Sequence, residues 1–523
     1  MQRGRCATRR GLALLLTATL WGCAGNPPGS EFHKSTSAAF AHPEETPLGR
    51  QFAAEAHEHG DDSGFRIVSV GADGFRIRMQ MIDAAQKTLD LQYYIFRGDV
   101  TGRLLTDSLA RAAKRGVRIR LLIDDADTVP GDEQILRLLA FPSVEVRIFN
   151  PYGYRGHSKV LRDLDFLLHA SRLNYRMHNK LFVVDNALAV VGGRNIGNQY
   201  FQVDPESQFA DEDVFTVGPM VARLSGTFDE FWNSDLAIPA QALGHANPGS
   251  QARSGQSTAI DYAALFETRE PFAGIVSGRL PLAWAQARVV HDSPDKKEVI
   301  EGAQPGRLIV RAVMDSARDV KSEILMISPF FVPAPDELQL LEDLRRREVS
   351  VRVLTNSLES TPRIAAQSGY DRFRVPLLQE GAELYEVRSR LGNARGSGQT
   401  ARVSRFGNYA LHAKVYVFDR RRVFIGSMNY DQRSTHINTE IGLIIDSQEL
   451  ARQTAHRFDE MVKPENCYIL GLRPSAAPGV SQGLVWRTQE SGMDVEYTRE
   501  PARSGWQRVE VKLLTVLPLE REL

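Results

Sequence analysis

One polar motif occurs twice in this chain, and its repetition restricts the possible folds more than any other feature. The first copy comprises His178, Lys180, Asp185, Gly193 and Asn195. The second copy, 234 residues further on, comprises His412, Lys414, Asp419, Ser427 and Asn429. Apolar runs at 89–96 and 117–124 also recur, at 323–333 and 349–356. A near-constant offset across separated landmarks indicates two homologous structural units.

Apolar β-branched runs alternate with segments of helical period within each unit. Residues 101–115 repeat apolar side chains at intervals of three and four, and Gly116 follows as a helix C-cap. Strand, helix and strand in this order predict an α/β fold. We expect two homologous halves, with mixed sheets flanked by helices, packed around one pseudo-twofold active site.

The expected organisation has five segments. They are a signal peptide at 1–22, a lipidated tether at 23–64, a first half at 65–240, a connecting segment at 241–305 and a second half at 306–523. The tether is rich in Pro, Gly, Ser, His and Glu and poor in apolar periodicity, so we expect it to have little fold of its own. Residues 388–406 are expected to form an exposed loop before the second motif.

Strand geometry separates the members of each motif. His178 and Lys180 share one face of a strand, whereas Asp185 falls on the other face, roughly 16 Å beyond Lys180. The same argument separates His412 from Asp419. The two aspartates are therefore expected to fix the turn at the strand end.

A histidine that acts as nucleophile or acid needs a partner on its other ring nitrogen to hold its tautomer. The candidates are Glu440 and either Asp211 or Asp213, because each opens an apolar strand shortly after a motif. His157-Ser-Lys159 repeats the triplet alone, without the aspartate or the asparagine, and is expected to be a solvated surface group, as is His436.

Two histidines, two lysines and two asparagines brought together offer cations and amide donors around one anion. This predicts a phosphate site that requires neither a metal nor another cofactor. One imidazole can attack phosphorus to give a covalent phosphohistidine, while the other delivers a proton to the leaving alcohol. The symmetric repeat does not say which histidine attacks.

Both motifs resemble the paired signature of the phospholipase D superfamily. Further segments resemble the cardiolipin synthase C-like bacterial subgroup: Arg176-Met-His178-Asn-Lys180, Gly192-Gly-Arg-Asn-Ile-Gly-Asn198, Phe228-Asp-Glu-Phe-Trp232, Thr355-Asn-Ser357, Gly369-Tyr370 and the tail from Ser504 through Leu517-Pro518.

The resemblance implies a phosphatidyltransferase that makes a diphosphatidyl lipid from phospholipids such as phosphatidylglycerol and phosphatidylethanolamine, with an accessory protein as a possible partner. It implies His178 as nucleophile and His412 as acid and then base. It supports Asp211 and Glu440 as orienting carboxylates, and it counts Asp185 and Asp419 with the site. Gly193, Asn195, Ser427 and Asn429 are expected to bind or orient the phosphate. One departure is that Ala366-Gln367-Ser368 stands where a histidine is expected before Gly369.

The N-terminus predicts export. Four arginines precede an apolar run from Gly11 to Trp21, which is shorter than the roughly 20 residues of a transmembrane helix. Gly22-Cys23 resembles a lipoprotein cleavage site, so Cys23 is expected to be lipidated. Ala24 follows the cysteine, and by analogy this favours the outer membrane of a bacterial envelope, facing the periplasm. Loss of Cys6 and lipidation of Cys23 would leave Cys467 without a disulfide partner.

Three rival functions were weighed. A nuclease would need a basic surface, but the chain balances 64 Lys and Arg against 64 Asp and Glu, and loss of the four signal arginines leaves about −4, so no nucleic acid is expected. A phospholipase D that uses water shares the phosphohistidine and differs only in the second acceptor. A non-enzymatic lipid-binding lipoprotein would not need both histidines.

Overall fold

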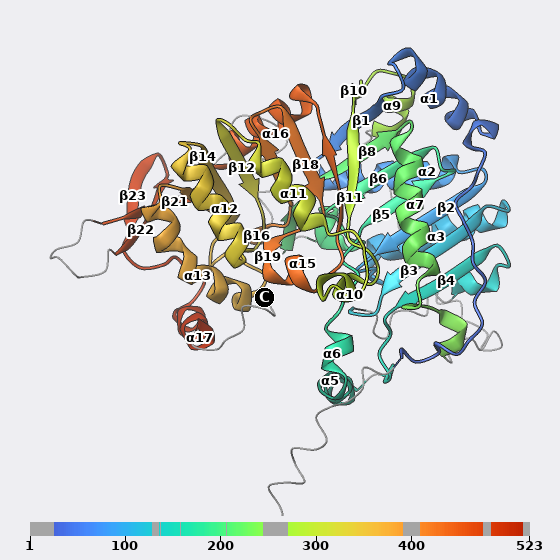
Figure 1. Cartoon of the computed structure of the whole chain (residues 1–523), viewed down its shortest axis with the longest axis horizontal. Coiled ribbons are helices and arrows are strands. Elements are labelled where there is room, and N and C mark those ends of the chain that lie inside the picture. Colours follow the sequence, from blue (N-terminus) through green and yellow to red (C-terminus); the bar gives the residue numbers. More distant parts are fainter. Residues whose placement is uncertain are drawn as a thin grey trace, which may run out of the picture.

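A computed structural model describes residues 26–127, 135, 137–156, 158–204, 207–243, 270–390, 408–473 and 483–515. The expected signal peptide, Cys23, His157, residues 391–406 of the expected loop and Leu517 lie outside the described residues. Figure 1 shows two α/β halves side by side, each built on one large sheet. The predicted α/β class with two homologous halves is confirmed.

The first half contains a nine-stranded mixed sheet. β2, β3 and β4 are parallel, and their neighbours β5 and β9 are antiparallel to them. The strand order is β10 (Ala283–Ala285), β1 (Ser63–Val68), β8 (Asp213–Val217), β6 (Leu188–Gly192), β5 (Leu181–Val184), β2 (Thr88–Tyr93), β3 (Arg118–Asp124), β4 (Val144–Phe149) and β9 (Ala237–Pro239). Its main helices are α2 (Gly71–Ala84), α3 (Val100–Lys114), α7 (Met220–Asn233) and α9 (Pro271–Val276).

The second half repeats this order in a ten-stranded sheet. Its strands are β11 (Ala287–His291), β20 (Ile441–Ile445), β18 (Arg422–Gly426), β17 (Val415–Phe418), β12 (Glu323–Ile327), β14 (Ser350–Asn356), β15 (Glu383–Val387), β21 (Cys467–Leu472), β22 (Leu484–Glu490) and β23 (Met493–Tyr497). Its main helices are α11 (Ile309–Arg318), α12 (Pro335–Arg346), α13 (Ile364–Gln379), α16 (Gln448–Met461) and α17 (Gly505–Thr515). β11 occupies the place of β1, so the expected connecting segment already contains one strand of the second sheet.

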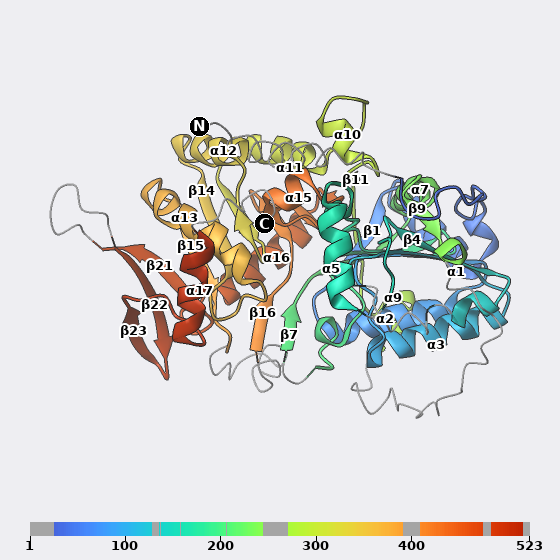
Figure 2. The same cartoon turned by 90° about the horizontal axis from the view of Figure 1, so that it is seen from below.

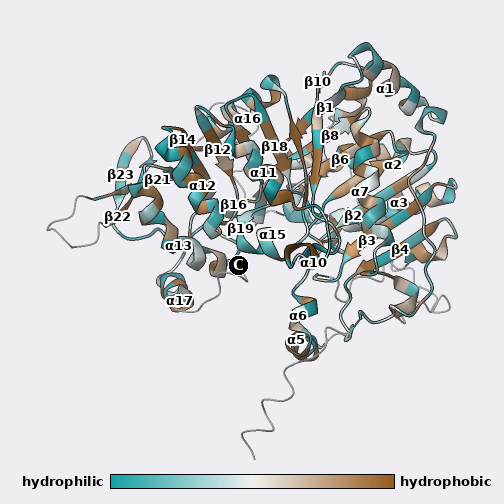
Figure 3. Cartoon of the chain, in the orientation of Figure 1, coloured by the Kyte–Doolittle hydropathy of each residue, from teal (hydrophilic) through white to brown (hydrophobic). Residues whose placement is uncertain are grey.

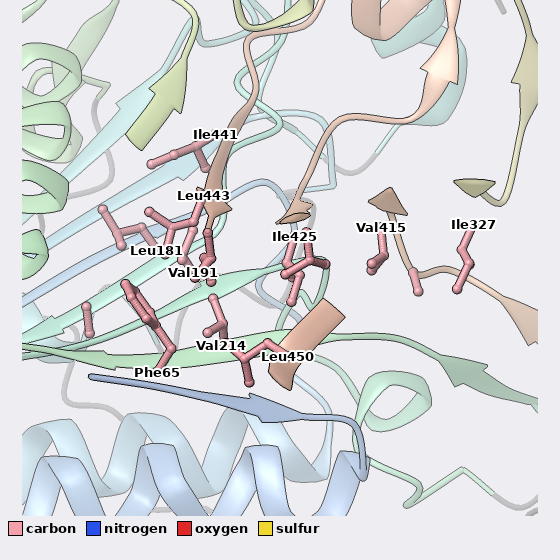
Figure 4. Close-up of a cluster of buried hydrophobic side chains, with 14 of the residues drawn as sticks. Phe65, Leu181, Val191, Val214, Ile327, Val415, Ile425, Ile441, Leu443 and Leu450 are labelled. Carbon is pink, nitrogen blue, oxygen red and sulfur yellow. The ribbon is translucent and has the colours of Figure 1, made fainter. Parts of the chain in front are cut away.

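The two sheets share one apolar core where the halves meet. Figure 4 shows Leu181 and Val191 of the first half in the same cluster as Ile425 and Leu443 of the second half. All four side chains are almost fully buried. Figure 3 shows that the strands of both sheets are largely hydrophobic, whereas the outer helices also carry hydrophilic residues. The shared core holds the halves in one arrangement, which a site built from both halves requires.

The segment before β1 packs on the first half. Its backbone amides at Ser37 and Ala39 donate to Asn233 and Asp229 of α7, at 3.1 and 2.8 Å. α1 (Pro47–Glu58) follows, capped by the side chain of Thr46. The expectation that residues 24–64 have little fold of their own is therefore wrong for the described part. Backbone hydrogen bonds attach this segment to the first half, and such bonds leave no apolar periodicity in the sequence.

Short elements complete the fold. They are β7 (Ser207–Ala210), β13 (Phe331–Val332), β16 (Asn408–Leu411), β19 (Tyr430–Asp431), α5 (Lys159–Leu168), α6 (Ala170–Leu173), α10 (Lys296–Ile300), α15 (Gln432–His436) and the 3-10 turns at Pro43–Glu45, Leu138–Ala140, Asn198–Tyr200 and Ala240–Leu243. β7 of the first half pairs in parallel with β16 of the second. Among the described residues, none of the helices combines the length and the apolar character needed to cross a membrane.

Candidate active site

Each histidine motif is bonded to the other half of the molecule. β16 pairs with β7, and the amide of His412 donates to the carbonyl of Ala210 at 2.7 Å. In the first motif an isolated parallel bridge joins Met177 to Thr439, and the amide of His178 donates to the carbonyl of Thr439 at 2.9 Å. Each histidine thus lies beside the residue that precedes a carboxylate of the opposite half.

The histidines and carboxylates form two crossed pairs. Nδ1 of His178 lies 2.8 and 2.9 Å from the two carboxylate oxygens of Glu440. Nδ1 of His412 lies 2.5 Å from Oδ2 of Asp211. Asp213, the alternative candidate, instead bonds Arg78 at 2.9 Å. Because the carboxylates hold Nδ1, the Nε2 atom of each imidazole is the nitrogen left for chemistry.

The two carboxylates have different surroundings. Glu440 accepts hydrogen bonds from the hydroxyls of Ser434, at 2.8 Å, and Ser427, and Ser427 in turn accepts from the amide of Ile441 at 3.0 Å. Gly193 holds the matching position of the first motif, where a Cβ atom would lie only 2.0 Å from Oδ1 of Asp211. Both positions were expected to bind or orient the phosphate, and the structure brings them against the carboxylates.

Both lysines are buried beside their histidines. Nζ of Lys180 and of Lys414 donates to the backbone carbonyl of the preceding histidine, and Nζ of Lys414 lies 3.0 Å from Nδ1 of His412. Burial lowers the pKa of Lys414 to about 8 and that of Lys180 well below its ordinary value. Two desolvated lysine side chains therefore lie beside the histidines, where an entering anion would favour their charged forms.

The histidines are kept neutral. Burial and then the charges of Lys180 and Lys414 lower the pKa of His178 well below 6.5. Burial and then Lys414 lower the pKa of His412 to about 4, although Asp211 opposes the shift. Since Lys414 of the second half acts on His178 of the first, the two motifs belong to one electrostatic site.

The carboxylates differ in charge. Against the effect of burial, His412 and then Lys414 lower the pKa of Asp211 to about 2. Burial raises the pKa of Glu440 to about 8, against the neighbouring Lys180. Near neutral pH the His412 pair therefore carries an ionised carboxylate, whereas the His178 pair shares a proton and titrates as one unit.

Aromatic rings and one arginine complete the site, and the sequence analysis missed them. Tyr94 meets His178 edge to face at 4.9 Å between centroids. Phe209 stacks on His412 at 5.2 Å, and Tyr200 meets the same ring edge to face at 5.2 Å. Arg363, which is exposed before α13, lowers the pKa of His178 by its charge. Tyr94 lies within the apolar run at 89–96, but only the fold shows that its ring meets a histidine.

The motif asparagines have different surroundings. Oδ1 of Asn195 accepts from the amide of Ile95 at 3.1 Å, and its Nδ2 donates to Tyr200 at 2.9 Å. Asn195 therefore positions the wall of the site. Asn429 is buried, and its Oδ1 has no hydrogen-bond partner among the described residues. Of the two, Asn429 is the one with hydrogen-bonding capacity left for a substrate.

The motif aspartates lie at the far strand ends, in the turns for which strand parity predicted them. Asp185 accepts from the amides of Gln86, Lys87 and Thr88 at 2.8 to 2.9 Å. Asp419 accepts in the same way from the amides of residues 321–323. Both residues have a φ of +53°, in the turn that follows their strand. The structure does not bring either aspartate to the histidines.

The stretch Ala366-Gln367-Ser368, where the resemblance implied a histidine, lies in α13, and the side-chain amide of Gln367 donates to Glu500 at 3.3 Å. No group of three or more His, Cys, Asp or Glu side chains in the described part of the chain is arranged to hold a metal ion. The donors that converge on the histidines are cations and amides, which suit a phosphate.

Comparison with known proteins finds one match to the same family model in each half of the chain. A family model described as "Cardiolipin synthase, PLD-like domain" matches residues 79–232 and 310–462, one copy in each half. Cardiolipin synthase C of Escherichia coli (strain K12) is 36% identical over 475 residues, which cover 88% of this chain and 97% of that protein. The major cardiolipin synthase ClsA of Bacillus subtilis (strain 168) is 26% identical over 76% of this chain and 69% of its own length.

Among solved structures, phosphatidylserine synthase of Haemophilus influenzae Rd KW20 is similar, with a TM-score of 0.50 and 13% identity. The match covers 80% of this chain and 92% of that one. At this level of identity the similarity concerns the fold.

Proposed function

Since the chain belongs to the family of cardiolipin synthases with PLD-like domains, we propose that its paired-histidine site makes cardiolipin by transferring a phosphatidyl group between two phospholipids. The observation that carries this proposal is the crossed pairing of His178 with Glu440 and of His412 with Asp211. Each half supplies the carboxylate that holds the histidine of the other half. Two oriented imidazoles flanked by buried lysines suit a two-step exchange at one phosphorus.

His178 is the nucleophile in this mechanism. Its pKa is lowered well below 6.5, which favours the neutral imidazole, and Nε2 carries the lone pair when Nδ1 donates its proton to Glu440. Nε2 forms a bond to the phosphorus of the donor lipid, and the bond from phosphorus to the headgroup oxygen breaks. Lys180 and Lys414 balance the charge on the non-bridging oxygens.

His412 is the proton carrier. His412 is neutral in the free site, but the phosphate anion of a bound donor offsets the charge of Lys414 that lowers its pKa. With the ionised carboxylate of Asp211, this anion stabilises the imidazolium of His412, which donates its Nε2 proton to the departing headgroup alcohol. In the second step neutral His412 takes the proton from the glycerol hydroxyl of phosphatidylglycerol. The hydroxyl oxygen then bonds to phosphorus while the bond to His178 breaks, and cardiolipin leaves.

The acceptor follows from the product. Cardiolipin carries two phosphatidyl groups on one glycerol, so phosphatidylglycerol supplies that glycerol. Phosphatidylglycerol or phosphatidylethanolamine serves as donor, with glycerol or ethanolamine as the leaving alcohol. If water enters in place of phosphatidylglycerol, the same intermediate yields phosphatidic acid.

We also propose that Cys23 carries a lipid anchor in the bacterial cell envelope and that the enzyme faces the periplasm, with the outer membrane favoured. The support is the arginine-rich start, the short apolar run and Gly22-Cys23-Ala24. Labelling of growing cells with a fatty-acid analogue should mark the wild-type protein and leave Cys23→Ser unmarked. Equal labelling of both proteins would contradict the anchor.

The activity is tested by lipid mass spectrometry. Purified protein is incubated with vesicles of phosphatidylglycerol and phosphatidylethanolamine, beside His178→Ala and His412→Ala. Cardiolipin formed by the wild type alone is the expected result. Phosphatidic acid without cardiolipin would indicate hydrolysis. Absence of any lipid product would contradict the proposal, unless activity returned on addition of an envelope extract, which would indicate an accessory protein.

A further inference from the structure

Helix α5 exposes an apolar stripe to solvent. Its exposed fractions are 75% for Val160, 46% for Leu161, 49% for Leu164, 73% for Leu167 and 70% for Leu168. This spacing places all five side chains along one side of the helix. A helix of a soluble protein normally turns such a side toward the core. Here the stripe has no cover among the described residues.

Helix α17 of the other half repeats this arrangement. Trp506, Val509 and Leu513 recur at intervals of three and four and are 70%, 44% and 64% exposed. The opposite side of the helix buries Gln507 and Val511 against the second half. The stripe is therefore presented by a helix that is itself anchored in the fold.

The two helices that carry the stripes lie on one face of the molecule. α5 and α17 lie along the lower edge in Figure 1 and on the near side in Figure 2, which views the molecule from below. β16 and β7 lie between the two helices in Figure 2. These strands lead directly into His412 and Asp211, so the face that carries the stripes is also the face next to the site.

Positive charge accompanies each stripe. Residues 155–172 contain four Arg and Lys and two Asp, and residues 499–515 contain four Arg and Lys and two Glu, a net charge of +2 for each segment. The whole chain is balanced at 64 against 64. Apolar side chains flanked by basic residues are complementary to an anionic phospholipid surface.

We propose that α5 and α17 are interfacial helices that dock the protein on an anionic phospholipid bilayer. The inference deepens the proposed function, on which it rests, because it supplies the surface from which lipid substrates enter. The apolar stripes insert below the headgroups, while Arg and Lys contact lipid phosphates. Docking through one helix of each half directs the site, which lies between the halves, at the membrane.

A pocket of about 740 Å³ supports a lipid as the occupant of this face. Phe166 of α5 and Ala170 of α6 form part of its wall. Tyr175, which lies three residues before His178, and Arg433, which lies next to Ser434, form other parts. One side of α5 thus faces solvent with an apolar stripe, and the helix also borders a cavity beside the catalytic segments.

Quenching of tryptophan emission tests the docking directly in the full chain. Vesicles of phosphatidylglycerol and phosphatidylethanolamine with brominated acyl chains should quench Trp506, and the loss should be smaller in Trp506→Phe. The variant Leu164→Trp in the Trp506→Phe background should restore the quenching and report on α5. Equal quenching of the wild type and Trp506→Phe, with no gain from Leu164→Trp, would refute the proposal.

Turnover separates docking from chemistry. The double variant Leu164→Glu with Leu168→Glu should lower cardiolipin formation in vesicles about tenfold and leave it unchanged in detergent micelles, because only vesicles require insertion. Met493→Glu, at a 68% exposed apolar residue of β23, is the matched control and should change neither rate.

Three outcomes decide between explanations. Unchanged vesicle turnover in the double variant would overturn docking through α5. A wild-type dimer that the double variant dissociates would assign the stripe to a second copy of the chain and would also overturn the proposal. A wild type that turns over no lipid in either vesicles or micelles would contradict the proposed function, while the quenching result would still decide whether the helices dock.

Discussion

Replacement of Glu440 by glutamine should separate orientation of His178 from the rest of the chemistry. Glu440 is fully buried and accepts from Nδ1 of His178 at 2.8 and 2.9 Å and from the hydroxyls of Ser427 and Ser434. Glutamine has nearly the same shape but one acceptor oxygen and two new N–H donors. Its amide therefore cannot accept all three hydrogen bonds in the present arrangement.

The expected loss follows from the hydrogen bond to His178. The imidazole of His178 gains positive charge as Nε2 bonds to phosphorus, and a hydrogen bond to a charged group is worth about 1.5–3 kcal/mol. At 1.36 kcal/mol per factor of ten, this corresponds to a fall in kcat of roughly 10- to 150-fold. The Michaelis constant should change little, because Glu440 is buried behind His178 and does not itself face a substrate.

Cardiolipin formation at saturating lipid is the assay, with thermal unfolding measured in parallel. Glu337→Gln is the matched control, because Glu337 is equally buried and its pKa is also raised to about 8 by burial. Its carboxylate bonds Thr435 and the amide of Ala334 and contacts neither histidine. A kcat of Glu440→Gln within threefold of the wild type would refute the role given to this carboxylate.

Three further predictions concern residues around the site. Asp185→Asn keeps a residue that tolerates positive φ but removes the negative charge that faces three backbone amides. The unfolding free energy measured in denaturant should therefore fall by about 1.5–3 kcal/mol. A reduced kcat of the folded protein with unchanged stability would instead give Asp185 a catalytic role. Burial raises the pKa of Glu337 from its ordinary 4.5 to about 8 in the folded protein. Its contribution to the free energy of unfolding is therefore full below pH 4.5, and it falls by about 1.4 kcal/mol per pH unit as the pH rises toward 8. Glu337→Gln should remove this slope, and identical pH profiles for the two proteins would show the assignment to be wrong. Gly193→Ser should lower kcat at least tenfold, in steady-state assays of cardiolipin formation, because its Cβ would displace Asp211; full activity of this variant would contradict the close approach.

The duplicated architecture could be predicted because similar sequence patterns recur at equivalent strands of the two halves. β2 and β12, which begin at Thr88 and Glu323, fall on the repeated apolar runs, and α3 ends one residue before the predicted helix does. The spacing of apolar residues and the constant offset between the repeats are both visible in the sequence, so these local features can be predicted from it. Strand parity also separated Asp185 from Lys180 and predicted the turn that the aspartate stabilises.

The crossed pairing could not be predicted, because the paired residues are 262 and 201 positions apart in the chain. Strand position alone left Asp211 and Asp213 as alternatives, and the family resemblance favoured Asp211; packing shows that Asp213 instead neutralises Arg78. The contact of Ser427 with Glu440 arises within the second half, where β18 and β20 are neighbouring strands, and the spacing of the motif does not reveal this pairing.

Other differences arise where the local pattern is ambiguous. β10 and β11 are short runs of three and five residues in the expected connecting segment, yet they complete two different sheets. Residues 159–168 begin at the lysine of the His-Ser-Lys triplet and form an amphipathic helix whose apolar side faces outward. Periodicity predicts that such a helix has an apolar side, but not what covers it.

Trapping of the covalent intermediate tests the central claim most directly. A phosphatidyl donor with a p-nitrophenol leaving group needs no proton from His412, so His412→Ala should release one burst of p-nitrophenol and then stop. Digestion near neutral pH and mass spectrometry should find the phosphatidyl group on His178, and His178→Ala should show neither burst nor adduct. An adduct on His412 in the wild type, or steady turnover without any adduct, would contradict the mechanism.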